Sequence, residues 1–272
     1  MTEAPASEEA VPAHPASTVL LLRDTPRGFE VHLQQRRAEM SFGPLAYVFP
    51  GGSVDAGDRA PETRSLLGGV DLSAAAARME LDGDDADREL CAALYVCAVR
   101  EVFEEAGVLL ARPLDGGDRA HDPSAVGEVR DRVLAMAGFA GELRGLGLRP
   151  AVEDLAYVAR FITPVGLPRR YDARFFVARV PEGQDIDVHA GEASTGRWFT
   201  PGDLLEREDV VLMPPTRVML AELRRHDDVA SVIADLGARE VCGILFAFRH
   251  ITQPLPDHLP TVAEVEGMEA RL

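Results

Sequence analysis

The sequence CAALYVCAVREVFEEAGV, residues 91–108, decides how this chain folds. Its first half is apolar on nearly every side of a helix, and such a helix lies inside a protein and not on its surface. Its second half adds three glutamates, Glu101, Glu104 and Glu105, which fall within an arc of about 100° on a helix. The pattern therefore raises the question of why a buried helix gathers like charges.

Two explanations of the three carboxylates are open. Glutamate favours helices, so a solvated acidic helix end would account for an isolated EVFEE. However, Glu101 and Glu105 lie one turn apart and repel each other by roughly a few tenths of a kcal/mol, and Arg100 offsets only part of this cost. Carboxylate oxygens gathered on one face are also the ligands that hard divalent cations prefer. The preceding apolar run must be buried, which weakens the first explanation and leaves the metal site as the alternative to be weighed against the rest of the sequence.

The composition narrows the possible functions. The 272 residues are 46% hydrophobic and 27% charged, as expected for a globular protein. A net charge of −17 argues against nucleic acid or an anionic membrane as a partner. The chain contains no lysine, which excludes a P-loop lysine or a Schiff-base lysine. The N-terminus lacks the features of a signal peptide, so we expect a cytoplasmic protein with reduced, buried cysteines.

The hydrophobic patterns predict strands and helices in one mixed α/β sandwich, of class α/β (α+β). Strands are expected at 17–23, 29–36, 46–49, 156–164, 174–180 and within 243–251, and helices at 86–106, 126–139, 142–146, 214–225 and 228–236. Asp84 or Asp85 is expected to cap the central helix, and Gly107 to end it. We expect a disordered tail at 1–15, a main domain at 16–240 with a surface insertion at 59–84, and a C-terminal extension at 241–272.

Two separated stretches resemble one known motif. FPGGSVDAGD (49–58) and REVFEEAGV (100–108) look like the two halves of the Nudix box of the Nudix hydrolases. Between Asp58 and Arg100 lie 41 residues where the box has seven, so 34 are extra. Such an insertion is tolerable because the cost of loop closure grows slowly with length. The insertion is similar to that of the branch containing the peroxisomal coenzyme A diphosphatase. The resemblance implies an α/β/α sandwich with a central mixed sheet and extra C-terminal helices.

The resemblance also implies roles for the residues of the box. Glu101, Glu104 and Glu105 would bind the metal, with Glu101 or Glu105 as an alternative catalytic base. The backbone carbonyl of Gly51 or Gly52 would complete the metal coordination.

Two further residues would assist these glutamates. Arg100 would orient them and pair with Asp58, which stands where the family has glutamate. Glu192 would be a late acidic residue that assists catalysis, with a plain loop glutamate as the alternative.

Several residues outside the box are candidates for binding the substrate. Arg169 and Arg170 could hold phosphates between two strands, although a charged turn would explain them equally simply. Arg36, Arg37 and Phe42 precede the PGG loop and could contact a nucleotide or pantetheine group, or simply be surface residues. The histidines show no HxxH or HExxH spacing, so zinc is not expected.

The resulting expectation is a diphosphatase dependent on Mg²⁺ or Mn²⁺. It would hydrolyse coenzyme A or acyl-CoA to 3′,5′-ADP and a 4′-phosphopantetheine product. The same chemistry on ADP-ribose, NADH or another nucleoside diphosphate derivative is the alternative. A third possibility is a regulatory domain that binds nucleotides without turnover. A homodimer is possible, and neither nucleic acid nor a membrane is expected as a partner.

Overall fold

The computed structural model describes residues 11–40, 43–81, 84–116, 123–135, 138–189, 193–241, 243–245 and 259. The strands of the main sheet are β1 (Ala13–Thr25), β2 (Gly28–Arg36), β3 (Ala46–Val48), β4 (Gly51–Ser53), β7 (Ala156–Ile162), β8 (Arg170–Arg179), β9 (Ala193–Phe199), β10 (Val211–Leu212) and β11 (Gly243–Leu245). A separate pair consists of β5 (Ala111–Pro113) and β6 (Leu148–Pro150). The helices are α1 (Pro61–Arg64), α2 (Leu72–Arg78), α3 (Asp85–Ala106), α4 (Pro123–Leu134), α5 (Phe139–Gly145), α6 (Pro201–Leu205), α7 (Pro214–Leu223) and α8 (Val229–Ala238).

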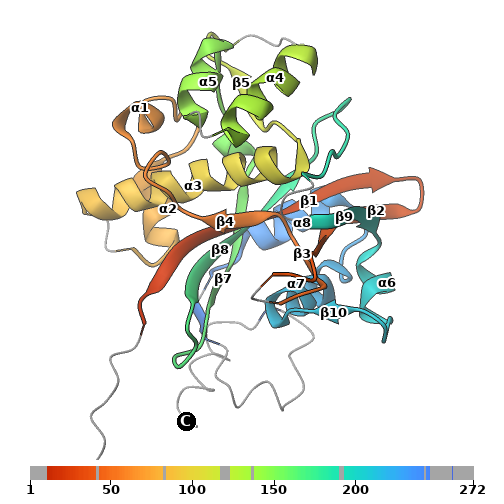
Figure 1. Cartoon of the computed structure of the whole chain (residues 1–272). Coiled ribbons are helices and arrows are strands. Elements are labelled where there is room, and N and C mark those ends of the chain that lie inside the picture. The colour runs from red at the N-terminus through yellow and green to blue at the C-terminus, as the bar shows by residue number, and fades with distance from the viewer. Residues whose placement is uncertain are drawn as a thin grey trace, which may run out of the picture.

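The main sheet is mixed. Its order is β10-β3-β2-β1-β8-β7-β11, while β4 pairs with β1 and β9 pairs with β2. The central strand β1 runs antiparallel to β2 and parallel to β8. Figure 1 shows α3 crossing one face of this sheet, with α1, α2, α4 and α5 on the same side and α7 and α8 on the other. The expected α/β sandwich with a mixed sheet is therefore confirmed.

Alternation along β1 explains why helices cover both faces. Val19 and Leu21 belong to the core under α3, whereas Leu20 and Leu22 belong to the core under α7 and α8. All four side chains are fully buried. A strand buried on both faces reads as a continuous apolar run because successive side chains point to opposite faces.

Helix α3 begins and ends close to the predicted positions. The Asp84 side chain accepts a hydrogen bond from the Asp87 backbone N–H at 2.8 Å and so caps the helix. Gly107 ends it in the left-handed conformation at φ +71°. Every residue from Cys91 to Phe103 is buried, so the acidic half of the helix starts inside the protein, as its apolar first half required.

The insertion after the PGG loop contains two helices, although the sequence showed no sustained periodicity there. In α1 and α2, Thr63 and Ala76 are buried, and Met79 just after α2 is fully buried against α3. The Arg78 guanidinium donates to the backbone carbonyls of Tyr157 and Arg239 at 2.9 and 3.1 Å. These helices are too short for a helical period to stand out, and their packing is what defines them.

The described residues bear on the membrane expectation and on where the first strand begins. Among the residues that the structure describes, no helix is long and apolar enough to cross a membrane. Strand β1 begins at Ala13, a few residues earlier than the sequence indicated. The tail before residue 11 and most of the extension after residue 245 lie outside the described residues.

His32 on β2 is a buried ionisable side chain. It is fully buried beside Trp198, and neither ring nitrogen has a hydrogen-bond partner among the described residues. Burial lowers the pKa of His32 from 6.5 to about 4. A backbone contact with Arg197 raises this pKa by a smaller amount, and the positive charge of Arg23 lowers it further. The imidazole is therefore held neutral in the folded protein.

We predict that His32 makes the folded protein less stable as the pH falls from 7 to 5. The unfolded chain takes up the His32 proton near pH 6.5, while the folded protein does so only near pH 4. The loss should approach about 1.4 kcal/mol per pH unit below pH 6.5 and stop below pH 4. Urea unfolding of His32→Leu and wild type across this pH range measures the difference. The exposed His14 serves as the control, through His14→Gln; equal pH slopes for all three proteins would contradict the prediction.

Candidate active site

The PGG loop is pressed against α3 by strand pairing. Gly51 pairs with Thr18 of β1, and a Cβ at Gly51 would lie 2.3 Å from the Ser17 carbonyl oxygen. A Cβ at Gly52 would lie 2.4 Å from Glu101 Oε1. Glycine is needed at both positions, because a side chain at Gly51 would push the loop off β1 and one at Gly52 would push it away from Glu101. The Gly51 N–H also donates to Glu105 Oε2 at 3.0 Å, which fixes the loop to the last turn of the helix.

Arg100 connects the two halves of the motif. Its guanidinium binds Asp58 through two hydrogen bonds, Nε to Oδ1 at 2.9 Å and Nη2 to Oδ2 at 2.8 Å. Nη1 also donates to Glu101 at 2.8 Å and to Glu104 at 3.1 Å, and Nη2 to the Ser53 carbonyl at 3.1 Å. One guanidinium thus holds the loop and two glutamates in a fixed relation.

The loop itself brings Asp58 within reach of Arg100. The Asp55 N–H donates to Asp58 Oδ2 at 3.0 Å, and the Asp58 N–H donates to Asp55 Oδ1 at 2.9 Å. This reciprocal pair folds residues 55–58 into a tight turn. The aspartate at position 58 therefore reaches Arg100 even though it is one carbon shorter than the glutamate of the family motif.

The charges at this site do not balance. Arg100 carries one positive charge, yet it hydrogen-bonds the carboxylates of Asp58, Glu101 and Glu104, and that of Asp55 lies 3.7 Å away. Burial raises the pKa of Glu104, and Arg100 only partly opposes this. Burial disfavours the charge on Arg100, but the hydrogen bond to Asp58 and the charge of Glu101 outweigh it and raise the pKa of Arg100. A half-buried site with excess carboxylate oxygens is suited to a hard divalent cation.

Cys97 packs next to this site as a buried thiol that stays protonated at neutral pH. It is fully buried, and its thiol donates to the Gly52 carbonyl at 3.5 Å. Burial raises the pKa of Cys97 well above its ordinary value, and the nearby Asp58 and Glu101 add to the effect. Cys91 and Cys97 are both unpaired and buried, while Cys242 lies outside the described residues. The Gly52 carbonyl, expected at the metal, thus accepts from a thiol here.

Arg130 holds the C-terminal end of α3, a role that sequence reasoning missed. Its guanidinium donates to the Glu104 carbonyl at 2.9 Å and to the Asp187 carboxylate at 2.7 Å. A cation here also suits the negative end of the helix dipole. The His189 N–H donates to the Glu105 carbonyl at 2.9 Å, so the chain approaching β9 is attached to the last turn of α3. Arg130 is one of two arginines on the helix predicted at 126–139, and nothing in that pattern indicated this contact.

A cavity of about 490 Å³ opens next to Glu105. Its walls come from β1, β2, β8, the PGG loop and the start of α7. The lining residues are Ala16, Thr18, Gln34, Arg36, Met40, Val48, Phe49, Gly51, Gly52, Ser53, Glu105, Phe161, Ile162, Thr163, Pro164, Leu167, Arg169, Tyr171, Ala173, Phe175, Ala193, Met213, Pro214, Pro215 and Thr216. Its size is within the usual range for small-molecule sites, roughly 300–1,000 Å³.

In each of the two predicted arginine pairs, one member lines the cavity and the other does not. Arg36 lines it, whereas Arg37 is exposed and pairs with Glu39 at 3.5 Å. Arg169 lines it as an exposed residue. Arg170 instead donates to the backbone carbonyls of Thr163, Pro164 and Val11 and so fixes the start of β8. Arg36 is the last residue of β2 and Arg170 the first of β8, so Arg37 and Arg169 lie in the adjoining loops and take other directions.

Two of the predicted site residues lie outside the described residues. These are Phe42, expected near the substrate, and Glu192, expected to assist catalysis. Both roles stay predictions.

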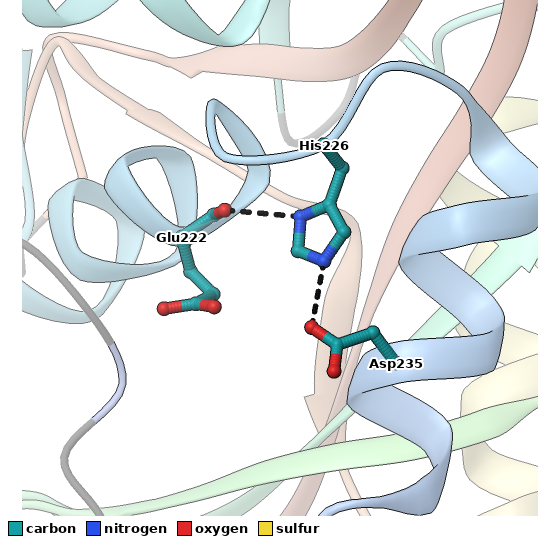
Figure 2. Close-up of side chains that lie close together, drawn as sticks. All are labelled: Glu222, His226 and Asp235. Atoms are coloured by element: carbon teal, nitrogen blue, oxygen red, sulfur yellow. Dashed lines mark hydrogen bonds and ion pairs between the residues drawn. The ribbon is translucent and has the colours of Figure 1, made fainter.

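A second group of possible metal ligands lies far from the box in sequence. Figure 2 shows Glu222 and His226, at and just after the end of α7, with Asp235 of α8. His226 Nε2 contacts Asp235 at 2.9 Å, and its Nδ1 faces the Glu222 backbone carbonyl at 3.2 Å. Arg239 donates to the Glu222 carboxylate at 2.7 Å and to Asp235 at 2.5 Å. Since Arg239 pairs with both carboxylates and Arg225 lies 3.9 Å from Glu222, the group acts as an ion-pair cluster that joins α7 to α8.

Comparison with known proteins agrees with this geometry. Residues 5–225 match the profile of the NUDT19 Nudix domain. A crystal structure of a NUDIX hydrolase from Alicyclobacillus acidocaldarius superposes with a TM-score of 0.64 at 26% identity, covering 82% of this chain and 96% of that one. The chain therefore belongs to the Nudix hydrolase family, in the group of the NUDT19 Nudix domain.

Two curated relatives carry the name acyl-coenzyme A diphosphatase NUDT19. The human protein is 30% identical over 236 residues, covering 75% of this chain and 62% of the relative. The Gallus gallus protein is 31% identical over 238 residues, covering 73% and 62%. This chain spans about 62% of the length of these relatives.

We predict that Arg100→Gln destabilises the fold by about 3–5 kcal/mol, because it leaves the buried Asp58 carboxylate without its partner. Urea unfolding at pH 7 without added metal measures the change. Arg207 forms an exposed ion pair with Asp209, so the control Arg207→Gln should cost no more than about 1 kcal/mol. Equal losses for the two variants would show that Arg100 does not hold the loop to the helix.

Proposed function

We propose that this protein is a metal-dependent diphosphatase that hydrolyses coenzyme A or acyl-CoA. The products would be 3′,5′-ADP and 4′-phosphopantetheine or its acyl derivative. The observation that carries the proposal is the carboxylate cluster of α3, of which Glu105 lines a largely apolar cavity. The names of the human and chicken relatives support the choice of substrate.

In this proposal Glu101 and Glu104 hold Mg²⁺ or Mn²⁺, and Glu105, the third glutamate of the group, acts as the base. The excess of carboxylates around Arg100 and the close approach of Gly52 to Glu101 fit such an ion. A divalent ion at this place would neutralise phosphate charge and lower the pKa of a bound water. Arg100 keeps Glu101 and Glu104 oriented, and the PGG loop brings its backbone close to the diphosphate.

The reaction adds one water molecule across the phosphoric anhydride. The water oxygen forms a bond to one phosphorus atom while the bond from that phosphorus to the bridging oxygen breaks, which gives two phosphate monoesters. We assign the proton acceptor to Glu105, because it is the glutamate of the three that lines the cavity. Its Oε2 is held by the Gly51 N–H, which orients the carboxylate toward the loop.

Two further residues have proposed roles. Arg36 and Arg169 line the cavity and would bind phosphate oxygens of the substrate. Glu192, outside the described residues, keeps its proposed role as a late acidic residue that assists catalysis.

We predict that Glu104→Gln lowers kcat for coenzyme A, because Glu104 is proposed to bind the metal directly. Losing a residue that only hydrogen-bonds a metal ligand costs ~10–100-fold in activity, and the loss here should exceed that. The assay incubates the protein with Mg²⁺ and, separately, coenzyme A, ADP-ribose and NADH, and follows phosphorus-bond cleavage. Glu89→Gln on the same helix is the matched control and should retain full activity. If wild type cleaves none of the three compounds, the protein is not a diphosphatase for these substrates. If ADP-ribose is cleaved far faster than coenzyme A, the protein is a diphosphatase but coenzyme A is not its substrate.

We further predict that the metal acts through α3 and not through the cluster at α7 and α8. Mg²⁺ should raise the melting temperature of wild type and of His226→Gln by similar amounts, because binding to the folded state stabilises it. It should raise that of Glu104→Gln much less. Differential scanning calorimetry with and without Mg²⁺ measures these shifts. Loss of the shift in His226→Gln alone would assign the ion to the second cluster.

A further inference from the structure

Gln34 on β2 is a polar residue of the cavity to which the proposed reaction gives no role. Its side chain lines the cavity although only 3% of the residue is exposed. Its Nε2 atom is buried and has no hydrogen-bond partner among the residues that the structure describes. Its sequence neighbour Gln35 differs, because Gln35 Nε2 donates to the Leu45 carbonyl at 3.2 Å.

A buried amide without a partner costs stability, typically about 1–3 kcal/mol. Such a group in a native protein therefore needs an explanation. Buried polar atoms without a partner also occur in His32, Arg130, Tyr157 and Arg174, but none of these four residues lines the cavity. Among these five described residues, Gln34 is the one that a bound molecule in the cavity could reach, so a ligand group is the natural partner for its amide.

The walls around Gln34 limit what that ligand group can be. Val48, Phe49, Phe161, Phe175 and Met213 give the cavity an apolar surface. A neutral carboxamide among such side chains cannot compensate the desolvation of a phosphate charge. It can satisfy an uncharged group that offers both a carbonyl and an N–H, which is the chemistry of a secondary amide. The terminal amide of glutamine can present either its oxygen or its nitrogen by rotation about the last torsion.

We propose that Gln34 is a specificity residue that binds a secondary amide of the substrate, in the half that enters the cavity. This inference rests on the proposed function, under which that half is the pantetheine part of coenzyme A with its two secondary amides. Glu105 and the PGG loop at the cavity wall place the diphosphate next to α3. The charged nucleotide half then lies on the open side, where the exposed Arg169 is available.

The unusual composition of the chain makes a direct test possible. It contains no asparagine and only four glutamines, Gln34, Gln35, Gln184 and Gln253. An ¹⁵N-correlated NMR spectrum therefore holds just four pairs of side-chain amide signals, and Gln34→Met and Gln35→Met assign two of them by loss. Pantetheine titrated into wild-type protein with a chelator present should shift the Gln34 pair saturably and leave the Gln35 pair in place.

This experiment needs no turnover, so its result is separate from that of the activity assay. An unmoved Gln34 pair at saturating or millimolar pantetheine would overturn the inference. A larger movement of this pair with 3′,5′-ADP than with pantetheine would also overturn it. If wild type hydrolyses no coenzyme A but pantetheine still shifts the Gln34 pair, the proposed function is wrong and the amide site stands.

Kinetics supply a second readout that a merely structural role would not produce. Gln34→Met keeps the side-chain length but removes the hydrogen bond, so KM for coenzyme A should rise about tenfold with kcat nearly unchanged. An alkyl ester of ADP with matched chain length lacks the amides, and its kcat/KM should change less than about twofold. Gln35→Met should leave both substrates unaffected. An equal loss on both substrates in Gln34→Met would show that the residue only supports the fold.

Discussion

The arrangement of the active site depends on one buried guanidinium. Arg100 binds Asp58 of the loop and Glu101 and Glu104 of α3, and only 9% of its side chain is exposed. A salt bridge this deep adds little net stability compared with an apolar contact of the same size, because both charges lose their water. Its effect is on geometry: it leaves the loop and the helix a single relative position. The carboxylates that it does not neutralise are what suit the site to a cation.

The insertion shows how the two halves of the motif stay together across 41 intervening residues. The loop and the helix are in contact through Arg100, Gly51 and Gly52. The chain between them therefore has only to connect the end of the loop to the start of the helix. It does so as two short helices that pack on α3, and Arg78 extends from them to the backbone of β7. The insertion thus adds to the core under α3. Its packing keeps it on the face of the sheet opposite α7 and α8, away from the helix α7 that lines the cavity.

The cavity forms where several separate elements converge. The strands β1, β2 and β8 supply one wall, and the start of α7 with Pro214 and Pro215 supplies another. The two prolines suit the first turn of a helix because they lack an N–H to satisfy. The same residues line the cavity. Under the proposed function, the chemistry at α3 and the recognition of the remainder of the substrate are therefore built by different parts of the chain.

The sequence by itself determined the helix around residues 86–106, its cap and its end, and the grouping of three glutamates on one face. It did so because helical period, capping and glycine conformation are local properties. The motif resemblance supplied the pairing of the loop with that helix. Long-range packing decided the remainder: Arg130 at the end of α3, the division of Arg169 from Arg170, and the unpartnered amide of Gln34. These features depend on which side chains meet after residues distant in sequence are brought together, and no local pattern specifies that.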